Sequence, residues 1–293
     1  MNLFNTIGQF NRQATEGEKP TKDLSNRLND HLGATQYHPF EVKEETERAG
    51  DLRISRLSNP CIRQLVFKIL RPDIKDPPPP PGLRKIFDQG KATHSWWQNN
   101  YYGPMGSLIG GWKCSICKET TERSTMPKHR CQNRVSIETP SGKIVTSCED
   151  LGSYWKYVEP EIRFEMHGFE VTGHCDGEMA LDDMTVLEMK TMDSDRWKRL
   201  ACPVPKDVVQ SSCYAHELDC PKILLSYIEK NTWATKDYLI DADQTAWGWL
   251  DKQIGVIRML VDQQSPFNAP RTCKNKKSSA ARACGFADLC FNE

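Results

Sequence analysis

Hydrophobic and polar positions along the chain follow two periods, one typical of helices and one typical of strands. Apolar residues recur at helical spacing and predict helices over residues 52–70, 83–102, 206–218 and 243–263. Alternating or continuous apolar stretches predict strands over residues 154–165, 170–181, 185–191 and 221–228. Helices and strands that mix in this way indicate an α/β fold.

Four segments depart from this pattern. Residues 1–50 are polar and rich in charge, and we expect a peripheral extension there. Five consecutive prolines lie within 76–82 and predict an extended linker. Apolar residues thin out over 111–150 while cysteines appear, which indicates a small inserted module. The C-terminal stretch 271–293 is basic, poor in large apolar residues and again bears cysteines.

Composition restricts the class of protein. The 39 basic and 39 acidic residues cancel, which argues against a protein that binds nucleic acid by bulk charge. No apolar stretch is long enough for a membrane span, and the N-terminus has no secretory pattern. We therefore expect a cytoplasmic protein without a membrane partner. In that reducing compartment, closely spaced members of its 12 cysteines are better explained as metal ligands than as disulfides.

The segment expected to form the strand 185–191 carries candidate chemistry. Side chains two positions apart on a strand point to the same face. Glu188 and Lys190 therefore project together, while Leu187 and Met189 face the opposite way into a core. Because a Glu-x-Lys triplet is common, an ordinary solvent-exposed pair is the alternative for these residues alone.

A second carboxylate is expected beside this pair. Asp176 lies on the preceding strand, and a turn at Asp182-Asp183 would bring it close to Glu188 in a hairpin. Two carboxylates so placed form a hard oxygen site suited to Mg²⁺ or Mn²⁺. A lysine beside them can orient water or stabilise charge on a phosphate.

Four cysteines in the inserted module have the spacing of a metal site. Cys114 and Cys117 form a C-x-x-C knuckle in a polar loop, as zinc sites require, and Cys131 is a natural third ligand. Two residues compete for the fourth place. Cys148 would complete a four-thiolate site and is preferred, whereas His129 is closer in sequence.

Four motifs occur in order across residues 61–290 and together resemble the PD-(D/E)xK nucleases of the RecB type. They are Gly90-Lys91-Ala92-Thr93-His94, Asp176-Gly177, Leu187-Glu188-Met189-Lys190-Thr191 and Gln210-Ser211-Ser212-Cys213-Tyr214. Each motif alone is weak, and their order and spacing carry the resemblance. By pattern, the chain is most similar to the iron–sulfur members, which are the AddB nuclease domain and the CRISPR-associated exonucleases. Phage-encoded homologues are also similar.

The resemblance implies a fold and a set of roles. The fold would be a central mixed sheet flanked by helices, formed by residues 51–293 with the module inserted. Asp176, Glu188, the Met189 carbonyl and His94 would bind the divalent metal, and Lys190 would be the catalytic lysine. Gln210 and Tyr214, one helical turn apart, would support the lysine and contact the DNA backbone. Glu161 is a further acidic candidate near the site.

The same resemblance implies an iron–sulfur cluster. One cysteine before the core and three at the C-terminus would hold a [4Fe–4S] cluster, namely Cys61, Cys273, Cys284 and Cys290. The chain departs from the usual pattern because the basic insertion 274–283 separates Cys273 from Cys284. Zinc in place of iron, or free cysteines, are the alternatives. The other four cysteines are expected to be reduced and structural: Cys175, Cys202, Cys213 and Cys220.

Together these features predict a metal-dependent deoxyribonuclease. By resemblance, the substrate is single-stranded DNA or DNA ends, cleavage is exonucleolytic, and partners in recombination or replication are possible. A subunit that binds DNA without cutting it is the alternative. Four aromatic residues near His94 would either stack on unpaired bases or pack against the zinc module, and these are Trp96, Trp97, Tyr101 and Tyr102.

Overall fold

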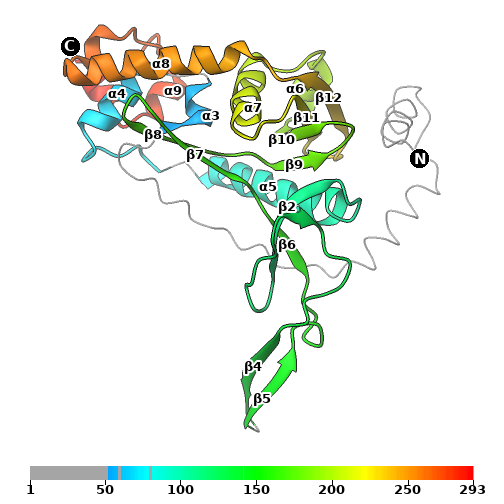
Figure 1. Cartoon of the computed structure of the whole chain (residues 1–293). Helices are drawn as coiled ribbons and strands as arrows, with labels where there is room; N and C mark the ends of the chain where they lie inside the picture. The colour runs from blue at the N-terminus through cyan, green and yellow to red at the C-terminus, as the bar shows by residue number, and fades with distance from the viewer. Residues whose placement is uncertain (1–51, 59–60, 79–80, 141, 293) are drawn as a thin grey trace. The chain divides into compact units, whose positions relative to one another are not determined.

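The computed structural model describes residues 52–58, 61–78, 81–140 and 142–292 (Figure 1). The expected extension over residues 1–50 lies outside the described residues. The described part is a mixed α/β structure with mixed sheets and helices, which confirms the expected class. Among the described helices, none combines the length and the apolar character needed to cross a bilayer.

The larger sheet carries the segment 185–191 at its centre. Its strands follow the order β12-β11-β10-β9-β2-β3, and β6 also pairs with β2. Strands β10 and β11 are parallel, and their other neighbours are antiparallel. The bounds are β2 (Leu108–Cys114), β3 (Ser124–Thr125), β6 (Trp155–Val158), β9 (Gly177–Ala180), β10 (Met184–Met192), β11 (Lys222–Glu229) and β12 (Thr235–Asp241).

A smaller sheet of order β1-β8-β7 shows where the sequence pattern was too coarse. The single strand expected over 170–181 is two strands, β8 (Phe169–His174) and β9, which belong to different sheets. The strand expected over 154–165 is likewise divided into β6 and β7 (Glu161–Met166). Pro160 lies at that break, where its missing N–H interrupts a ladder. Strand β1 (Leu52–Arg53) pairs in parallel with β8.

The expected helices form, with adjusted ends. The stretch 52–70 begins as β1 and continues as α3 (Ile54–Leu57) and α4 (Ile62–Leu70). Helix α5 begins inside the expected linker, because proline is well suited to the first helical turn. The remaining bounds are α5 (Pro81–Trp97), the π-helical turn η1 (Gln98–Tyr102), α6 (Ser194–Arg199), α7 (Pro205–Glu217), α8 (Thr245–Asp262), the 3₁₀ turn η2 (Pro266–Asn268), α9 (Ser279–Arg282) and α10 (Ala287–Phe291).

Two hydrophobic cores lie on opposite faces of β10. Val186 belongs to a core with residues of α4, α7 and α8, whereas Leu187 and Met189 belong to a core with residues of β2 and η1. This alternation is the one expected from the strand period. It leaves Glu188 and Lys190 on the α7 side of the sheet, where α7 contacts both β10 and β11.

The inserted module contains a hairpin that the sequence pattern did not predict. Strands β4 (Arg134–Thr139) and β5 (Gly142–Ser147) pair with each other in a sheet of their own. Isolated hairpins are marginal in water. The hairpin's two ends lie next to Cys131 and Cys148, which are buried together with Cys114.

The junction of β8 with α7 is closely packed and gives a test of the fold. A Cβ on Gly173 would lie 2.6 Å from Cε1 of Tyr214, so Gly173→Ala forces a buried ring or a strand to move. We expect a loss of about 1–3 kcal/mol in the free energy of unfolding, measured by denaturant titration. Gly248→Ala in α8 is the matched control, because nothing lies within 4 Å of its Cβ. An equal loss in both variants would contradict the packing described.

Candidate active site

Three side chains expected to form the site converge at the start of the β9–β10 hairpin. Leu187 pairs with Gly177, so Asp176 enters the hairpin beside Glu188. Asp176 Oδ2 accepts the Met189 N–H at 2.6 Å, which ties the carboxylate to β10. Lys190 Nζ donates to Glu188 Oε1 at 2.6 Å. The hairpin therefore brings both carboxylates and the lysine together, as their sequence pattern predicts.

Helix α5 delivers His94 to the same place. Its Nδ1 lies 2.8 Å from Asp176 Oδ1, although the two residues are 82 positions apart. Burial works to lower the pKa of His94, but the Asp176 carboxylate raises it above its ordinary value. Burial alone would raise the pKa of Asp176, and the charge and hydrogen bond of His94 lower it instead. The pair thus favours a charged imidazole beside an ionised carboxylate.

Glu188 has an environment that does not satisfy a full negative charge. Both Lys190 and Gln210 donate to Oε1, at 2.6 and 2.9 Å, yet Oε2 is buried without a hydrogen-bond partner among the described residues. Burial raises the pKa of Glu188 to about 7, against the opposing attraction of Lys190. A buried carboxylate oxygen without a partner is costly, and a cation is one group that would satisfy it.

Lys190 stays charged in this setting. Burial works to lower its pKa, but the carboxylates of Glu188, Asp176 and Asp207 raise it above the ordinary value. Its Nζ also donates to Gln210 Oε1 at 3.3 Å, and about a quarter of the side chain is exposed. The ammonium group can therefore reach a ligand while it remains protonated.

Gln210 and Tyr214 form a supporting layer on α7. The Gln210 amide donates to Glu188 and to the Tyr214 hydroxyl, at 2.9 and 3.0 Å, while its oxygen accepts from Lys190. This agrees with the expected support of the lysine. The expected contact of Tyr214 with the DNA backbone is wrong, because its side chain is buried. Tyr214 orients Gln210 instead.

Two residues of the site escaped the sequence interpretation. Gln98, one helical turn after His94, donates to the Asp176 carbonyl at 2.7 Å and to Glu159 at 2.9 Å. The charge of Glu159 also acts on His94. The position of Gln98 on the face of His94 was the available signal. Glu161, the acidic candidate named from the sequence, is exposed on β7 and pairs with Arg163.

The aromatic residues after His94 have a structural use that neither expectation described. Trp97 and Tyr101 pack against the core on the Leu187 side of the central sheet, and Tyr102 is buried within it. They therefore pack on this sheet rather than on the cysteine module, and Tyr102 is inaccessible to a base. Trp96 instead meets Trp233 edge to face, with ring centroids 4.9 Å apart.

The cysteines of the inserted module form a compact ligand group. The sulfur atoms of Cys114, Cys117, Cys131 and Cys148 all lie within 4.8 Å of one another. Burial and the neighbouring thiols raise the pKa of Cys148 to about 12. His129 is not a member of this group. Four converging sulfurs can hold a metal ion or an iron–sulfur cluster.

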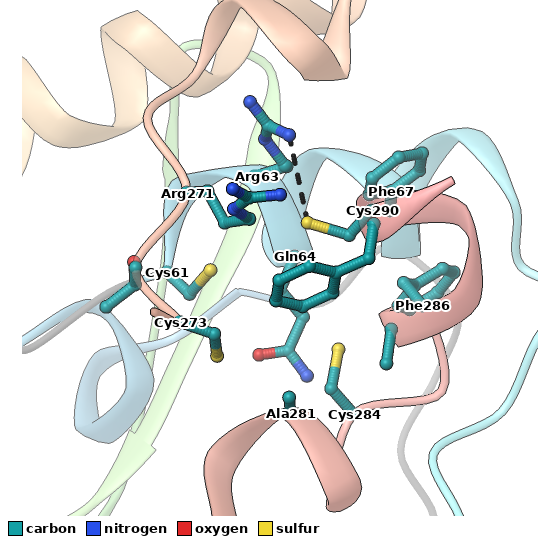
Figure 2. Close-up of a pocket in the computed structure, with 13 residues that line it drawn as sticks. Cys61, Arg63, Gln64, Phe67, Arg271, Cys273, Ala281, Cys284, Phe286 and Cys290 are labelled. Atoms are coloured by element: carbon teal, nitrogen blue, oxygen red, sulfur yellow. Dashed lines mark hydrogen bonds between the residues drawn. The ribbon is translucent and has the colours of Figure 1, made fainter. Parts of the chain in front are cut away.

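The four cysteines expected to hold the iron–sulfur cluster line one pocket, although they come from both ends of the described chain (Figure 2). Cys61 precedes α4, Cys273 and Cys284 flank α9, and Cys290 lies on α10. Arg63 donates to Cys290 Sγ at 3.8 Å and to the Ala269 carbonyl. Burial and the nearby charges of Asp76, Cys61 and Cys273 raise the pKa of Cys284. The pocket thus brings Cys61 together with three C-terminal cysteines that are more than 200 positions away in the sequence.

The remaining cysteines are free thiols, as expected. Cys175, Cys213 and Cys220 are buried, and Cys175 lies in the core as its alternation with Asp176 predicts. Cys202 is exposed, so the structural role expected for it is wrong.

Comparisons with known proteins give no family assignment. No family model matches the chain, and no curated protein sequence matches it. Among solved structures, SSO0001 is similar at a TM-score of 0.43 and 14% identity, covering 91% of this chain and 93% of that one. The alkaline exonuclease LHK-Exo of Laribacter hongkongensis is similar at a TM-score of 0.41 and 11% identity, covering 74% and 90%. The structure of LHK-Exo in complex with dAMP is similar at a TM-score of 0.42 and 9% identity, and covers the same shares of the two chains.

Proposed function

We propose that the protein is a metal-dependent nuclease that hydrolyses phosphodiester bonds of DNA. The observation that carries this proposal is the buried Glu188 Oε2, which has no hydrogen-bond partner in the described part of the chain. It belongs to a site that combines two carboxylates, a histidine and a protonated lysine. The four motifs that resemble RecB-type nucleases supply these same residues.

The donor set fits a hard divalent cation. Carboxylate oxygens of Asp176 and Glu188 are the ligands that Mg²⁺ and Mn²⁺ prefer, and an imidazole suits Mn²⁺ in addition. A cation beside Glu188 would keep that carboxyl ionised at neutral pH, where burial otherwise raises its pKa to about 7. We infer that Asp176 and Glu188 hold the cation, together with the Met189 carbonyl and His94, whose imidazole would give up its proton when the cation binds.

The chain's own groups would handle the phosphate. When bound, the cation would supply positive charge that favours deprotonation of water and stabilises a phosphate oxygen. Lys190 is charged and partly exposed, and its ammonium group would donate a hydrogen bond to the phosphate oxygen on which negative charge grows. Gln210 holds the side chains of Lys190 and Glu188 in place through one hydrogen bond to each. Gln98 fixes the main chain of Asp176.

Single-stranded DNA or DNA ends are the proposed substrate, and exonucleolytic cleavage is the proposed mode. Both follow from the resemblance to RecB-type nucleases. The same resemblance makes proteins of recombination or replication the proposed partners. The competing function is a subunit that binds DNA and does not cut, and a cleavage assay separates the two.

Cleavage should depend on Glu188 and Lys190 in different ways. Glu188→Gln removes a metal ligand, so we expect it to abolish cleavage, as should excess chelator. Lys190→Ala removes one charge-stabilising donor and should slow single-turnover cleavage by roughly a hundredfold to a thousandfold. End-labelled single- and double-stranded DNA with and without Mn²⁺ provides the measurement.

Two matched variants control for nonspecific effects. Glu165→Gln alters an exposed carboxylate farther along β7, and Lys252→Ala alters an exposed lysine on α8. Both should keep the wild-type rate. Undiminished cutting by folded Glu188→Gln would remove this site from the mechanism, and DNA binding without cleavage by the wild type would favour the non-cleaving subunit.

We further propose that the module's four cysteines bind one zinc ion. Four sulfurs within 4.8 Å of one another suit a tetrahedral Cys₄ site. The ion would let several neighbouring thiols ionise together, which their mutual repulsion otherwise opposes. It would also stabilise the β4–β5 hairpin, whose ends lie next to Cys131 and Cys148.

Loss of one ligand should release this zinc. We expect Cys114→Ser and Cys148→Ser each to lower the zinc content by one ion per chain, as measured by elemental analysis, and to expose residues 111–150 to protease. His129→Ala should retain the ion, because His129 is outside the sulfur group. Cys202→Ser is the control for loss of an exposed thiol. If Cys148→Ser keeps its zinc while His129→Ala loses it, the ligand set is wrong.

We propose that the four cysteines that line the pocket of Figure 2 hold a [4Fe–4S] cluster. They line one pocket, yet in the described part of the chain only the module's cysteines are close enough together to be a group for a single ion. A wider arrangement suits a cluster of several irons better than one zinc. Arg63, which donates to Cys290, would offset part of the negative charge of four thiolates.

Protein purified without oxygen should then be brown, with broad absorbance at about 400 nm and about four irons per chain. Cys61→Ser and Cys290→Ser should bleach it equally, although the two residues are 229 positions apart. Because the cluster closes so long a loop, its loss should cost several kcal/mol of stability, on the order of a cross-link. Cys202→Ser should keep the colour. Iron-free wild-type protein would exclude the cluster and leave the nuclease site unaffected.

A further inference from the structure

The first half of helix α5 exposes apolar side chains beside the proposed catalytic site. Leu83, Ile86 and Phe87 have exposed fractions of 39%, 47% and 51%. Farther along the chain, Thr93 of α5 and Gln98 at the start of η1 are buried against the rest of the protein. The helix is thus packed at its C-terminal end and exposed on all sides at the described positions of its N-terminal end.

The exposed apolar residues lie on the helix face that carries His94. With 3.6 residues per turn, positions 83, 87, 90 and 94 fall in one narrow stripe, and position 86 lies at its border. Gly90 lies over β10, since a Cβ there would be 3.5 Å from Thr191 Oγ1. One turn later His94 contacts Asp176. The exposed apolar residues therefore end about one turn before the point where this face packs on β10, and His94 reaches the carboxylates one turn beyond that point.

Basic side chains accompany the stripe. Arg84 and Lys91 are two turns apart on one flank, and Lys85 lies on the opposite side of the helix. All three are exposed. Asp88 is the one acidic residue between Pro81 and Trp97, so this helix carries net positive charge. The stripe itself spans about 16 Å from Leu83 to His94 at the usual helical rise.

We propose that this face of α5 binds an unpaired DNA strand and guides it into the site, an inference that rests on the nuclease function proposed above. Bases would stack on Phe87 and lie against Ile86 and Leu83, while phosphates would meet Arg84 and Lys91. Single strands offer bases and phosphates together, and proteins bind them with apolar or aromatic surfaces in a positively charged groove. A duplex keeps its bases stacked inside and cannot use the apolar stripe. The guide therefore selects unpaired ends.

Binding can be separated from cleavage in the Glu188→Gln background. Fluorescence anisotropy with labelled oligothymidylate should show about fivefold to a hundredfold weaker binding after the combined change Leu83→Ser, Ile86→Ser and Phe87→Ser. Affinity for a blunt duplex should change much less. Val145→Ser and Met259→Ser remove exposed apolar side chains on β5 and α8 and should leave binding unchanged.

The charge contribution has its own readout. Arg84→Gln with Lys91→Gln should reduce the slope of log affinity against log salt by about 1.4, which is about 0.7 for each lost phosphate contact on a single strand. Lys252→Gln on α8 should not change the slope. All of the side chains changed in addition to Glu188 are exposed, so unfolding midpoints should match that of the Glu188→Gln parent and report that the variants are folded.

The outcomes distinguish this inference from the nuclease function. Unchanged single-strand affinity in the triple variant would overturn the guide, even if the wild type cuts DNA. Weakened affinity would support the guide even if the wild type fails to cut. Sedimentation velocity tests the other occupants: if the triple variant loses a self-associated or partner-bound form and keeps its DNA affinity, the stripe is a protein interface and the inference is wrong.

Discussion

Two carboxylates side by side in a protein interior repel each other and lose their hydration, so other groups must hold them there. Asp176 and Glu188 meet this constraint unequally. Asp176 has His94 and a main-chain N–H, and its pKa is lowered. Glu188 accepts hydrogen bonds from Lys190 and Gln210 through one carboxylate oxygen, and its other oxygen has no partner among the described residues. This asymmetry is the reason that the site points to a cation.

Two helices and two apolar cores around β10 hold the groups that surround the carboxylates. Helix α5 contacts β10 and brings His94 to Asp176, and α7 contacts β10 and brings Gln210 to Glu188 and Lys190. Each face of β10 also has its own apolar core, which holds the strand rigidly between the two helices. A site built on a central strand and two packed helices keeps its side chains in place before a substrate arrives.

Local periodicity predicted the parts of the site that lie on one strand. The alternation over Leu187–Lys190 and the turn at 182–183 were enough to place Asp176, Glu188 and Lys190 together. The division of residues 170–181 between two sheets was beyond the pattern, because both halves alternate in the same way and only long-range pairing separates them. The hydrogen bond between Glu159 and Gln98 was missed because it depends on how β6 and η1 meet in the fold. For the module's cysteines, spacing supplied the members, whereas for Cys61 and the three C-terminal cysteines the family resemblance did. In both groups packing decided their proximity.

The position of the cysteine module has a consequence for how such a chain can change. Strands β2 and β6 are antiparallel partners, with Cys114 opposite Trp155, so everything between them is topologically one long hairpin loop. Lengthening a loop costs little conformational entropy once its ends are fixed. Within this loop β3 pairs with β2 at the edge of the sheet, so changes in the length of the module can leave the order β12-β11-β10-β9-β2, which holds the carboxylates, in place. The module is free to diversify while the sheet beneath it stays the same.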